Sequence, residues 1–361
     1  MNNLNVKIAG DYVNSYIYSG LLFLVKNGGE IILSDWKRVV RKKIKNIEHY
    51  EFINNCSNRI KEDFEDITFH LEEKEILDCI LDRSSLNFWP SDFIIYSNVL
   101  YFSGQNGVEA IGLDYGNKRF IEDNRKFIYS NRAYKLASAK QRGIAIAAGA
   151  NGVILKSINR YLDDITAPKL LEKKSVDIEW GASALVVNSE YVSSVDFFEK
   201  MPTPDFGTMT KEEKDNFNAL KISRSEEKEI PGYSWSVGDR LFSMNENNIK
   251  RSVISKEQGD ERFNVKEVNI KSEYYPFDNF DSARSGSFGC VVDLYDRIVL
   301  MNDNGIRELG RDLTKWKVFP RAKNYVNHLH MIEDDCLNIK IFARRDMISR
   351  KFGISPSNID A

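Results

Sequence analysis

The sequence predicts an all-β protein built from repeated antiparallel sheets, and a recurring turn is the main reason. The turn Asn27-Gly28 is followed by Asp35, seven residues after the second turn residue. The same offset recurs from Asn106-Gly107 to Asp114, Asn151-Gly152 to Asn159, Asn188-Ser189 to Asp196, and Asn304-Gly305 to Asp312. A fixed offset of this kind indicates an internal structural repeat.

The residues around each turn have the pattern of a β-hairpin. Asn and Gly tolerate the positive φ of a two-residue turn, so Asn-Gly between two β-rich runs is a strong hairpin signal. The runs 16–26 and 30–36 flank the first turn, and 95–102 and 109–115 flank the second. Further turns one strand earlier, such as Ser19-Gly20, add a third strand. Each unit is therefore expected to be a meander of at least three antiparallel strands.

Weaker copies of the unit extend the repeat over most of the chain. They are centred on residues 140–152, 233–248, 290–301 and 328–342. Runs such as 21–25 and 298–301 are apolar at every position, as expected for sheets buried on both faces by their neighbours. We expect six or seven units, because residues 39–86 could contribute a unit of their own.

On these residues the chain resembles the β-propeller class from about residue 5 to 343. Three of the turn acids are followed by an aromatic residue: Asp35-Trp36, Asp114-Tyr115 and Asp196-Phe197. This order is the reverse of the Trp-Asp pair of WD repeats, so the resemblance concerns architecture and no particular family. It implies one domain over residues 1–343, with six or seven four-stranded antiparallel blades, and an N-terminal strand near 6–8 that pairs with the last unit.

Three segments interrupt the repeat. Residues 37–66 are expected to form a helical insertion, or a divergent unit with strands at 67–71 and 76–80. A second insertion spans 202–231, where Thr210 and Glu213 form a capping box that begins a helix. The third, 344–361, is expected to be a short helix and a loose tail. Insertions on such a fold usually share one side, where function is often found.

Composition is that of a globular cytoplasmic protein. The chain has 361 residues, a net charge of -2 and 29% charged residues, which gives no overall attraction to nucleic acid or membrane. Its four cysteines show no pairing pattern, as expected in a reducing compartment. The apolar runs are too short to cross a bilayer. We therefore expect a cytoplasmic location and no membrane contact.

Two sets of polar residues are candidates for specific roles. The turn residues are expected to bond nearby backbone amides where a strand ends, and they are Asp35, Asp114, Asn159, Asp196 and Asp312. A basic run could bind phosphates or an acidic partner. It could instead be a solvated face that pairs with the acidic stretch 48–66, and it comprises Lys37, Arg38, Arg41, Lys42 and Lys43.

Signals for catalysis, metals and cofactors are weak. His328 and His330 alternate on an expected strand and would face the same side, but no spacing places a third ligand. The Gly-rich stretch 285–289 is expected to be a strand-entry loop. We expect no metal and no cofactor, and we assign no catalytic residue.

The function we favour is a non-catalytic protein-interaction scaffold, or a sensor subunit, of a multi-protein prokaryotic assembly. One alternative is a hydrolase or lyase with carboxylates in a central channel. Another is a nucleic-acid or nucleotide-binding module that uses the basic run and cations between Arg307 and Lys323. A protein partner is expected under the first hypothesis.

Overall fold

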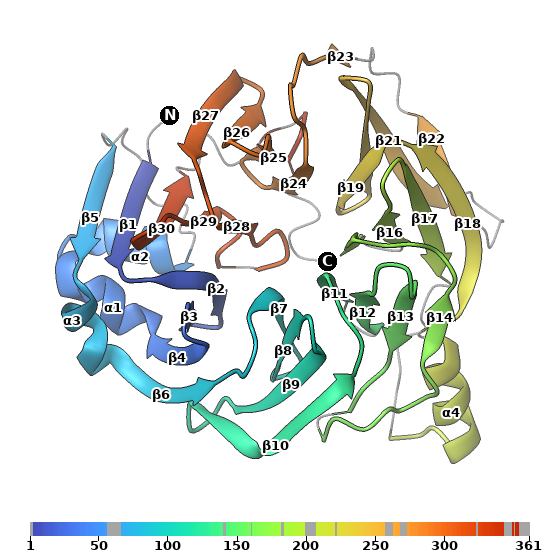
Figure 1. Ribbon diagram of the computed structural model, residues 1–361, viewed down its shortest axis with the longest axis horizontal. Helices are drawn as coiled ribbons and strands as arrows, with labels where there is room; N and C mark the ends of the chain where they lie inside the picture. Colours follow the sequence, from blue (N-terminus) through green and yellow to red (C-terminus); the bar gives the residue numbers. More distant parts are fainter. Residues whose placement is uncertain are drawn as a thin grey trace. The chain divides into compact units, whose positions relative to one another are not determined.

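The computed structural model confirms an all-β protein (Figure 1). It describes residues 3–55, 66–139, 142–159, 161–181, 184–198, 207–220, 222–256, 263–267, 273–322, 324–342, 349 and 351–353. The chain divides into two compact units. Unit 1 contains Met1–Trp89, Tyr115–Phe120 and Phe277–Ala361, and unit 2 contains Pro90–Asp114 and Ile121–Pro276.

Unit 2 holds four antiparallel sheets, which we number blades 2 to 5. Blade 2 contains β7 (Pro90–Tyr96), β8 (Val99–Gly104), β9 (Gly107–Asp114) and β10 (Arg119–Tyr129). Blade 3 contains β11 (Lys135–Ala139), β12 (Gly143–Ala147), β13 (Val153–Lys156) and β14 (Lys169–Leu171). Blade 4 contains β15 (Asp177–Trp180), β16 (Ala184–Asn188), β17 (Val192–Phe198) and β18 (Arg224–Pro231). Blade 5 contains β19 (Tyr233–Val237), β20 (Arg240–Asn245), β21 (Asn248–Lys256) and β22 (Phe263–Glu267), and β23 (Glu273–Tyr274) also pairs with β21.

Unit 1 holds blades 1, 6 and 7. Blade 1 contains β2 (Tyr12–Tyr18), β3 (Leu21–Lys26), β4 (Glu30–Asp35) and β6 (Ile80–Ser85). Blade 6 contains β24 (Ser282–Gly286), β25 (Gly289–Asp293), β26 (Arg297–Asn302) and β27 (Gly305–Arg311). Blade 7 contains β28 (Lys315–Val318), β29 (His328–Ile332), β30 (Cys336–Phe342), β1 (Asn3–Ala9) and β5 (Ile67–Leu71).

Blade 7 joins the two ends of the chain. β1 pairs antiparallel with β30, in a register that sets Val6 opposite Ile339, which confirms the expected pairing of the N-terminal strand with the last unit. β5 then adds to the far side of β1 as a parallel strand. The edge of β1 is thus covered by a segment from the first insertion, which leaves it no unpaired backbone edge.

The first insertion is helical, with one strand. It contains α1 (Trp36–Lys43), α2 (Ile47–Asn55), α3 (Glu73–Ile76) and the short 3₁₀ helix η1 (Leu77–Cys79). Of the two alternatives, the helical insertion is confirmed, and the divergent unit with a strand at 76–80 is not found: a capping box between Glu72 and Glu75 begins a helical turn there instead. The strand at 67–71 exists as β5, and residues 39–86 provide β6 to blade 1 without forming a separate blade.

The second insertion contains α4 (Lys211–Leu220), which begins at the predicted capping box. The Glu213 amide donates to Thr210 Oγ1 (3.2 Å), and the Thr210 amide donates to Glu213 Oε2 (2.7 Å). The insertion is shorter than predicted, because residues 224–231 form β18. The helix predicted for the tail falls mostly outside the described residues.

Four of the five predicted turns are equivalent in the structure. They join the second and third strands of blades 1 to 4, whereas Asn304-Gly305 joins the third and fourth strands of blade 6. In blade 6 the equivalent turn is at Tyr295-Asp296, so the fifth copy of the sequence pattern is offset by one strand.

The described residues form seven sheets, and the fold class is a seven-bladed β-propeller, where the sequence left six or seven blades open. The middle strands are apolar on both faces. In β17, for example, Phe198 packs with blade 3 residues, whereas Val195 and Phe197 pack with blade 5 residues such as Leu241. In the described part of the chain, no helix is long and apolar enough to span a membrane.

Candidate functional site

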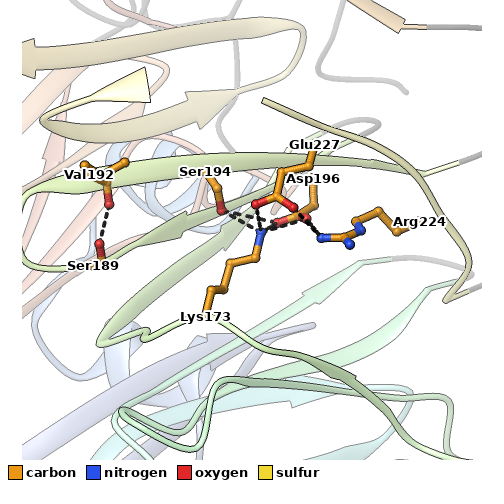
Figure 2. Close-up of polar contacts among 7 residues, drawn as sticks. All are labelled: Lys173, Ser189, Val192, Ser194, Asp196, Arg224 and Glu227. Atoms are coloured by element: carbon orange, nitrogen blue, oxygen red, sulfur yellow. Dashed lines mark hydrogen bonds and ion pairs between the residues drawn. The ribbon is translucent and has the colours of Figure 1, made fainter. Parts of the chain in front are cut away.

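A cluster of four charged side chains lies on blade 4 and the segment that leads into it (Figure 2). Its centre is Asp196 on β17, whose side chain is fully buried. Lys173 Nζ donates to both carboxylate oxygens of Asp196, at 2.9 and 2.8 Å, and an Arg224 guanidinium nitrogen donates to Oδ1 at 3.0 Å. Two cations therefore hold one buried carboxylate, an arrangement that offsets its desolvation.

Glu227 balances the charge of this cluster. Its carboxylate accepts from Lys173 at 2.7 Å and from Arg224 at 2.6 Å. The hydrogen bond from Lys173 lowers the pKa of the Glu227 carboxyl, against the opposing effect of partial burial. Lys173 also donates to Ser194 Oγ at 2.9 Å. The two acidic and two cationic side chains therefore satisfy one another. We call Lys173, Asp196, Arg224 and Glu227 the charge cluster.

The local sequence explains why charges gather here. Alternate residues of β17 face blade 3, and Asp196 and Phe198 share this face. The outer strand of blade 3, β14, has only three residues, so it covers little of the neighbouring sheet. The segment after β14 delivers Lys173 to the uncovered part. Because every charge in the cluster has an opposite partner, its chemistry is that of a structural ion-pair network.

The turn before β17 is closed by hydrogen bonds and carries an exposed tyrosine. Tyr191 lies in the turn between β16 and β17, and its side chain is 76% exposed. Ser189 closes the turn: both its amide (3.0 Å) and its hydroxyl (2.6 Å) donate to the Val192 carbonyl, the hydroxyl bond being drawn in Figure 2. The Gly232 amide donates to the Tyr191 carbonyl at 3.1 Å. We call residues 188–193 the tyrosine turn.

A buried asparagine anchors this turn to blade 5. Asn188 is 1% exposed, and its Oδ1 accepts from the Ser234 amide (2.9 Å) and from Ser193 Oγ (2.6 Å). Its Nδ2 donates to the Ser234 carbonyl at 2.8 Å and to Asp177 Oδ2 at 3.2 Å. The amide side chain is thus fully used, and the turn is fixed to two sheets.

Two other blades place a tyrosine near the equivalent turn. In blade 5, Tyr274 pairs with Asn248 beside the β20–β21 turn and is 64% exposed. In blade 6, Tyr295 lies in the β25–β26 turn and is 73% exposed. Around the tyrosine turn, Val176 and Val192 are also exposed, at 51% and 39%. Tyrosine side chains that protrude in this way are typical of contact surfaces between proteins.

The five predicted turn residues are found in different settings. Asp35 ends β4 and caps α1, accepting from the Arg38 amide at 3.2 Å. Asn159 accepts from the Tyr161 and Asp163 amides at 2.8 and 3.1 Å. Asp114 is the last residue of β9, and Asp312 has a positive φ of 51° after β27. Asp196 lies within β17 and belongs to the charge cluster.

The basic run lies on α1 and is partly paired. Lys42 forms an ion pair with Asp78, and Lys43 pairs with Glu75 at 2.7 Å. Arg41 lies over the Tyr50 ring, 4.6 Å from its centroid. Lys37 and Arg38 are exposed on the same helix. The acidic partners of Lys42 and Lys43 lie on η1 and α3, not in the acidic stretch 48–66, of which residues 56–65 lie outside the described residues.

His328 and His330 are buried on β29. His328 Nε2 lies 3.0 Å from the Ile53 carbonyl, and His330 Nδ1 lies 2.8 Å from Ser15 Oγ. Burial lowers the pKa of His328 to about 3 and the pKa of His330 well below its ordinary value, so both are neutral at pH 7. Among the described residues, no group of three or more His, Cys, Asp or Glu side chains could hold a metal ion.

Sequence reasoning missed Lys173, Arg224 and Glu227 as partners of Asp196. Each lies more than 20 residues from Asp196 along the chain, and only the fold brings them together. It also missed Tyr191. The sequence signal for Tyr191 was the polar segment 188–191 between two strands, which was interpreted only as a turn.

No family model and no curated protein matches this chain. Among solved structures, it is similar to an extracellular domain assigned to a hybrid two-component system of B. thetaiotaomicron (10% identity, TM-score 0.46), covering 92% of this chain and 40% of that one. It is also similar to BamB from Moraxella catarrhalis (9% identity, TM-score 0.46, 92% and 84% covered). A third is the Pan2 WD40 domain of Neurospora crassa (8% identity, TM-score 0.44, 92% and 89% covered). Likeness at this level indicates nothing about function.

Proposed function

We propose that this chain is a non-catalytic interaction scaffold, or a sensor subunit, of a multi-protein prokaryotic assembly in the cytoplasm, and that a protein partner binds at the tyrosine turn. The observation that carries the proposal is the exposed Tyr191 on a turn fixed by a buried polar network. Three free cysteines in the described residues, all buried, agree with a reducing compartment.

Rigidity is the reason to connect this turn with binding. Association costs free energy when loops and side chains become ordered, so a residue presented on a fixed backbone loses less on binding. Tyrosine adds a large contact area with few rotatable bonds and a polar tip, and it is enriched among residues that dominate binding energy. The Asn188 side chain donates two hydrogen bonds and accepts two, and all four hold this turn.

The proposed surface lies at the end of blade 4 opposite to the insertion of the same blade. In four-stranded antiparallel sheets, second-to-third turns lie at one end and third-to-fourth connections at the other. The insertion with α4 is the third-to-fourth connection of blade 4, whereas Tyr191 lies at the second-to-third turn of the same blade. Placing the contact surface at the turn end therefore departs from the expectation that function follows insertions.

Capture from the native host tests this proposal. Tagged wild-type protein should retain a partner under gentle conditions, and Tyr191→Ala should reduce its recovery at least about tenfold, since hot-spot tyrosines contribute about 2 kcal/mol or more. Tyr161→Ala is the matched control, because Tyr161 is 61% exposed in the third-to-fourth connection of blade 3. A wild-type protein that stays monomeric and alone would contradict the scaffold role, and equal losses in both variants would contradict the site.

A further inference from the structure

We propose that the partner segment at this surface is cationic, with a guanidinium or ammonium group that stacks on Tyr191 and pairs with Glu190. This inference rests on the proposed function and names the chemistry of the partner. It follows from the acids that accompany the exposed tyrosines of unit 2.

Glu190 is exposed beside Tyr191 in the tyrosine turn. The Tyr191 hydroxyl donates to Glu190 Oε1 at 2.9 Å, which orients the carboxylate along the phenol and raises the pKa of Tyr191. In the part of the chain that the structure describes, no Lys or Arg lies within ion-pair distance of Glu190. Its second oxygen, Oε2, is therefore open to a cation from outside.

The neighbouring turn in blade 5 repeats the combination. Glu246 is exposed at the β20–β21 turn, where Glu246 and Asn247 have φ values of 45° and 63°. Tyr274 flanks the same turn through its pairing with Asn248. Within the described ranges Glu246 also has no ion-pair partner. Blades 4 and 5 are joined directly by the Asn188–Ser234 bonds, so the two acid–tyrosine turns belong to adjacent sheets.

Blade 6 shows the contrasting case. Asp296 follows Tyr295 in the equivalent turn, but Arg297 pairs with its carboxylate at 2.8 Å, and Arg311 lies at 3.8 Å. There the chain supplies its own cations. The described residues supply no such cation to Glu190 or Glu246, which points to a partner that brings one.

The chain itself uses the chemistry that we infer for the partner. Arg41 lies over Tyr50 and Arg132 over Tyr134, each 4.6 Å from the ring centroid. A cation over an aromatic face and beside a carboxylate gains from both. Opposing charges are Lys174, exposed two residues before Val176, and Lys250, exposed two residues after Asn248. A cationic partner is repelled by these two lysines, so removing the charge of Lys174 should strengthen its binding.

The direct test uses a fluorescent nona-arginine peptide, with nona-glutamate as the negative probe, and fluorescence anisotropy on the full chain at low salt. Glu190→Gln should weaken nona-arginine binding about threefold, the effect of one exposed charge pair. Glu190→Gln/Glu246→Gln should weaken it about tenfold, and Lys174→Gln should strengthen it about twofold. Asp215→Asn, an exposed residue of α4, is the control. It should change binding less than about 1.5-fold, which is about the scatter of such measurements, because Asp215 lies outside the proposed surface.

Outcomes separate this inference from the proposed function. Equal weakening by Asp215→Asn and Glu190→Gln would mean diffuse attraction to the whole surface and would overturn the inference. If the host partner is lost with Tyr191→Ala but is unaffected by Glu190→Gln and by salt, the scaffold role stands and the cationic segment is wrong. Loss with both variants and with rising salt supports both.

Discussion

The two ends of β17 use polar residues for opposite purposes. Asp196 is fully buried and held by two cations, whereas Tyr191 is 76% exposed at the turn before the strand. Each member of the charge cluster has an ion-pair partner. The tyrosine turn presents a large side chain to solvent together with Glu190, which has no ion-pair partner among the described residues. This difference teaches that polar residues near the core here maintain the fold, whereas the ones on the rigid turn are available to a partner.

The largest expected effect on stability is that of Asp196→Ala. Without this carboxylate, Lys173 and Arg224 share Glu227 as their one anionic partner among the described residues, and two partly buried cations repel each other. We expect a loss of about 3 kcal/mol in the free energy of unfolding, because removing one member of a buried ion pair leaves an uncompensated charge. Urea denaturation measures it, and a loss below about 1 kcal/mol would show that the charge cluster is unimportant to the fold.

Asn188→Ala tests the link between the two ends. The Ser234 amide would lose its buried acceptor, whereas the Ser193 hydroxyl could still donate to the Gly232 carbonyl, so we expect about 2 kcal/mol of destabilisation. Asn216→Ala on exposed α4 is the control and should change stability by less than about 0.5 kcal/mol. Because the turn would also loosen, partner binding should weaken, and intact binding in this variant would contradict the role of rigidity.

A smaller effect is expected for Glu227→Gln, and it should depend on pH. The pKa of Glu227 is lowered in the folded protein from its ordinary value of 4.5, mainly by the hydrogen bond from Lys173. A lowered folded-state pKa gives stability that is present above the unfolded value and is lost as pH falls through the folded value. The variant should be less stable by about 0.5 to 1 kcal/mol at pH 7. The unfolding free energies of wild type and Glu227→Gln should converge as pH falls below 4.5 and through the folded-state pKa. A difference that persists in acid would show that the carboxylate charge is not the cause.

Much of the fold could be predicted from the sequence, since turns and apolar runs are local. The Asn27-Gly28 and Asn106-Gly107 hairpins formed as expected. The positive φ falls on a glycine in each, Gly29 (84°) and Gly107 (116°), and not on Asn27, Gly28 or Asn106. The sequence left a helical insertion and a divergent unit open after residue 36, and the alternative strand at 76–80 does not form because the capping box of Glu72 and Glu75 favours a helical turn. The fifth turn was assigned to the wrong strand pair because offset alone does not give strand order.

The candidate site could not be predicted to the same degree. Lys173 and Arg224 reach Asp196 only because a short β14 and the return from α4 bring them to one face of β17. The exposure of Tyr191 depends on which side chains of the hairpin point toward solvent. The alternation of residues in the flanking strands does not specify this at the turn itself. Pairing over long sequence separation therefore had to come from the structure.

The measurement that tests the central claim most directly is the dissociation constant of the captured host partner for wild type and Tyr191→Ala, by isothermal titration calorimetry. The account predicts an affinity at least about tenfold weaker for the variant, with an unfolding free energy within about 0.5 kcal/mol of wild type. Equal affinities for the two proteins, each correctly folded, would contradict it.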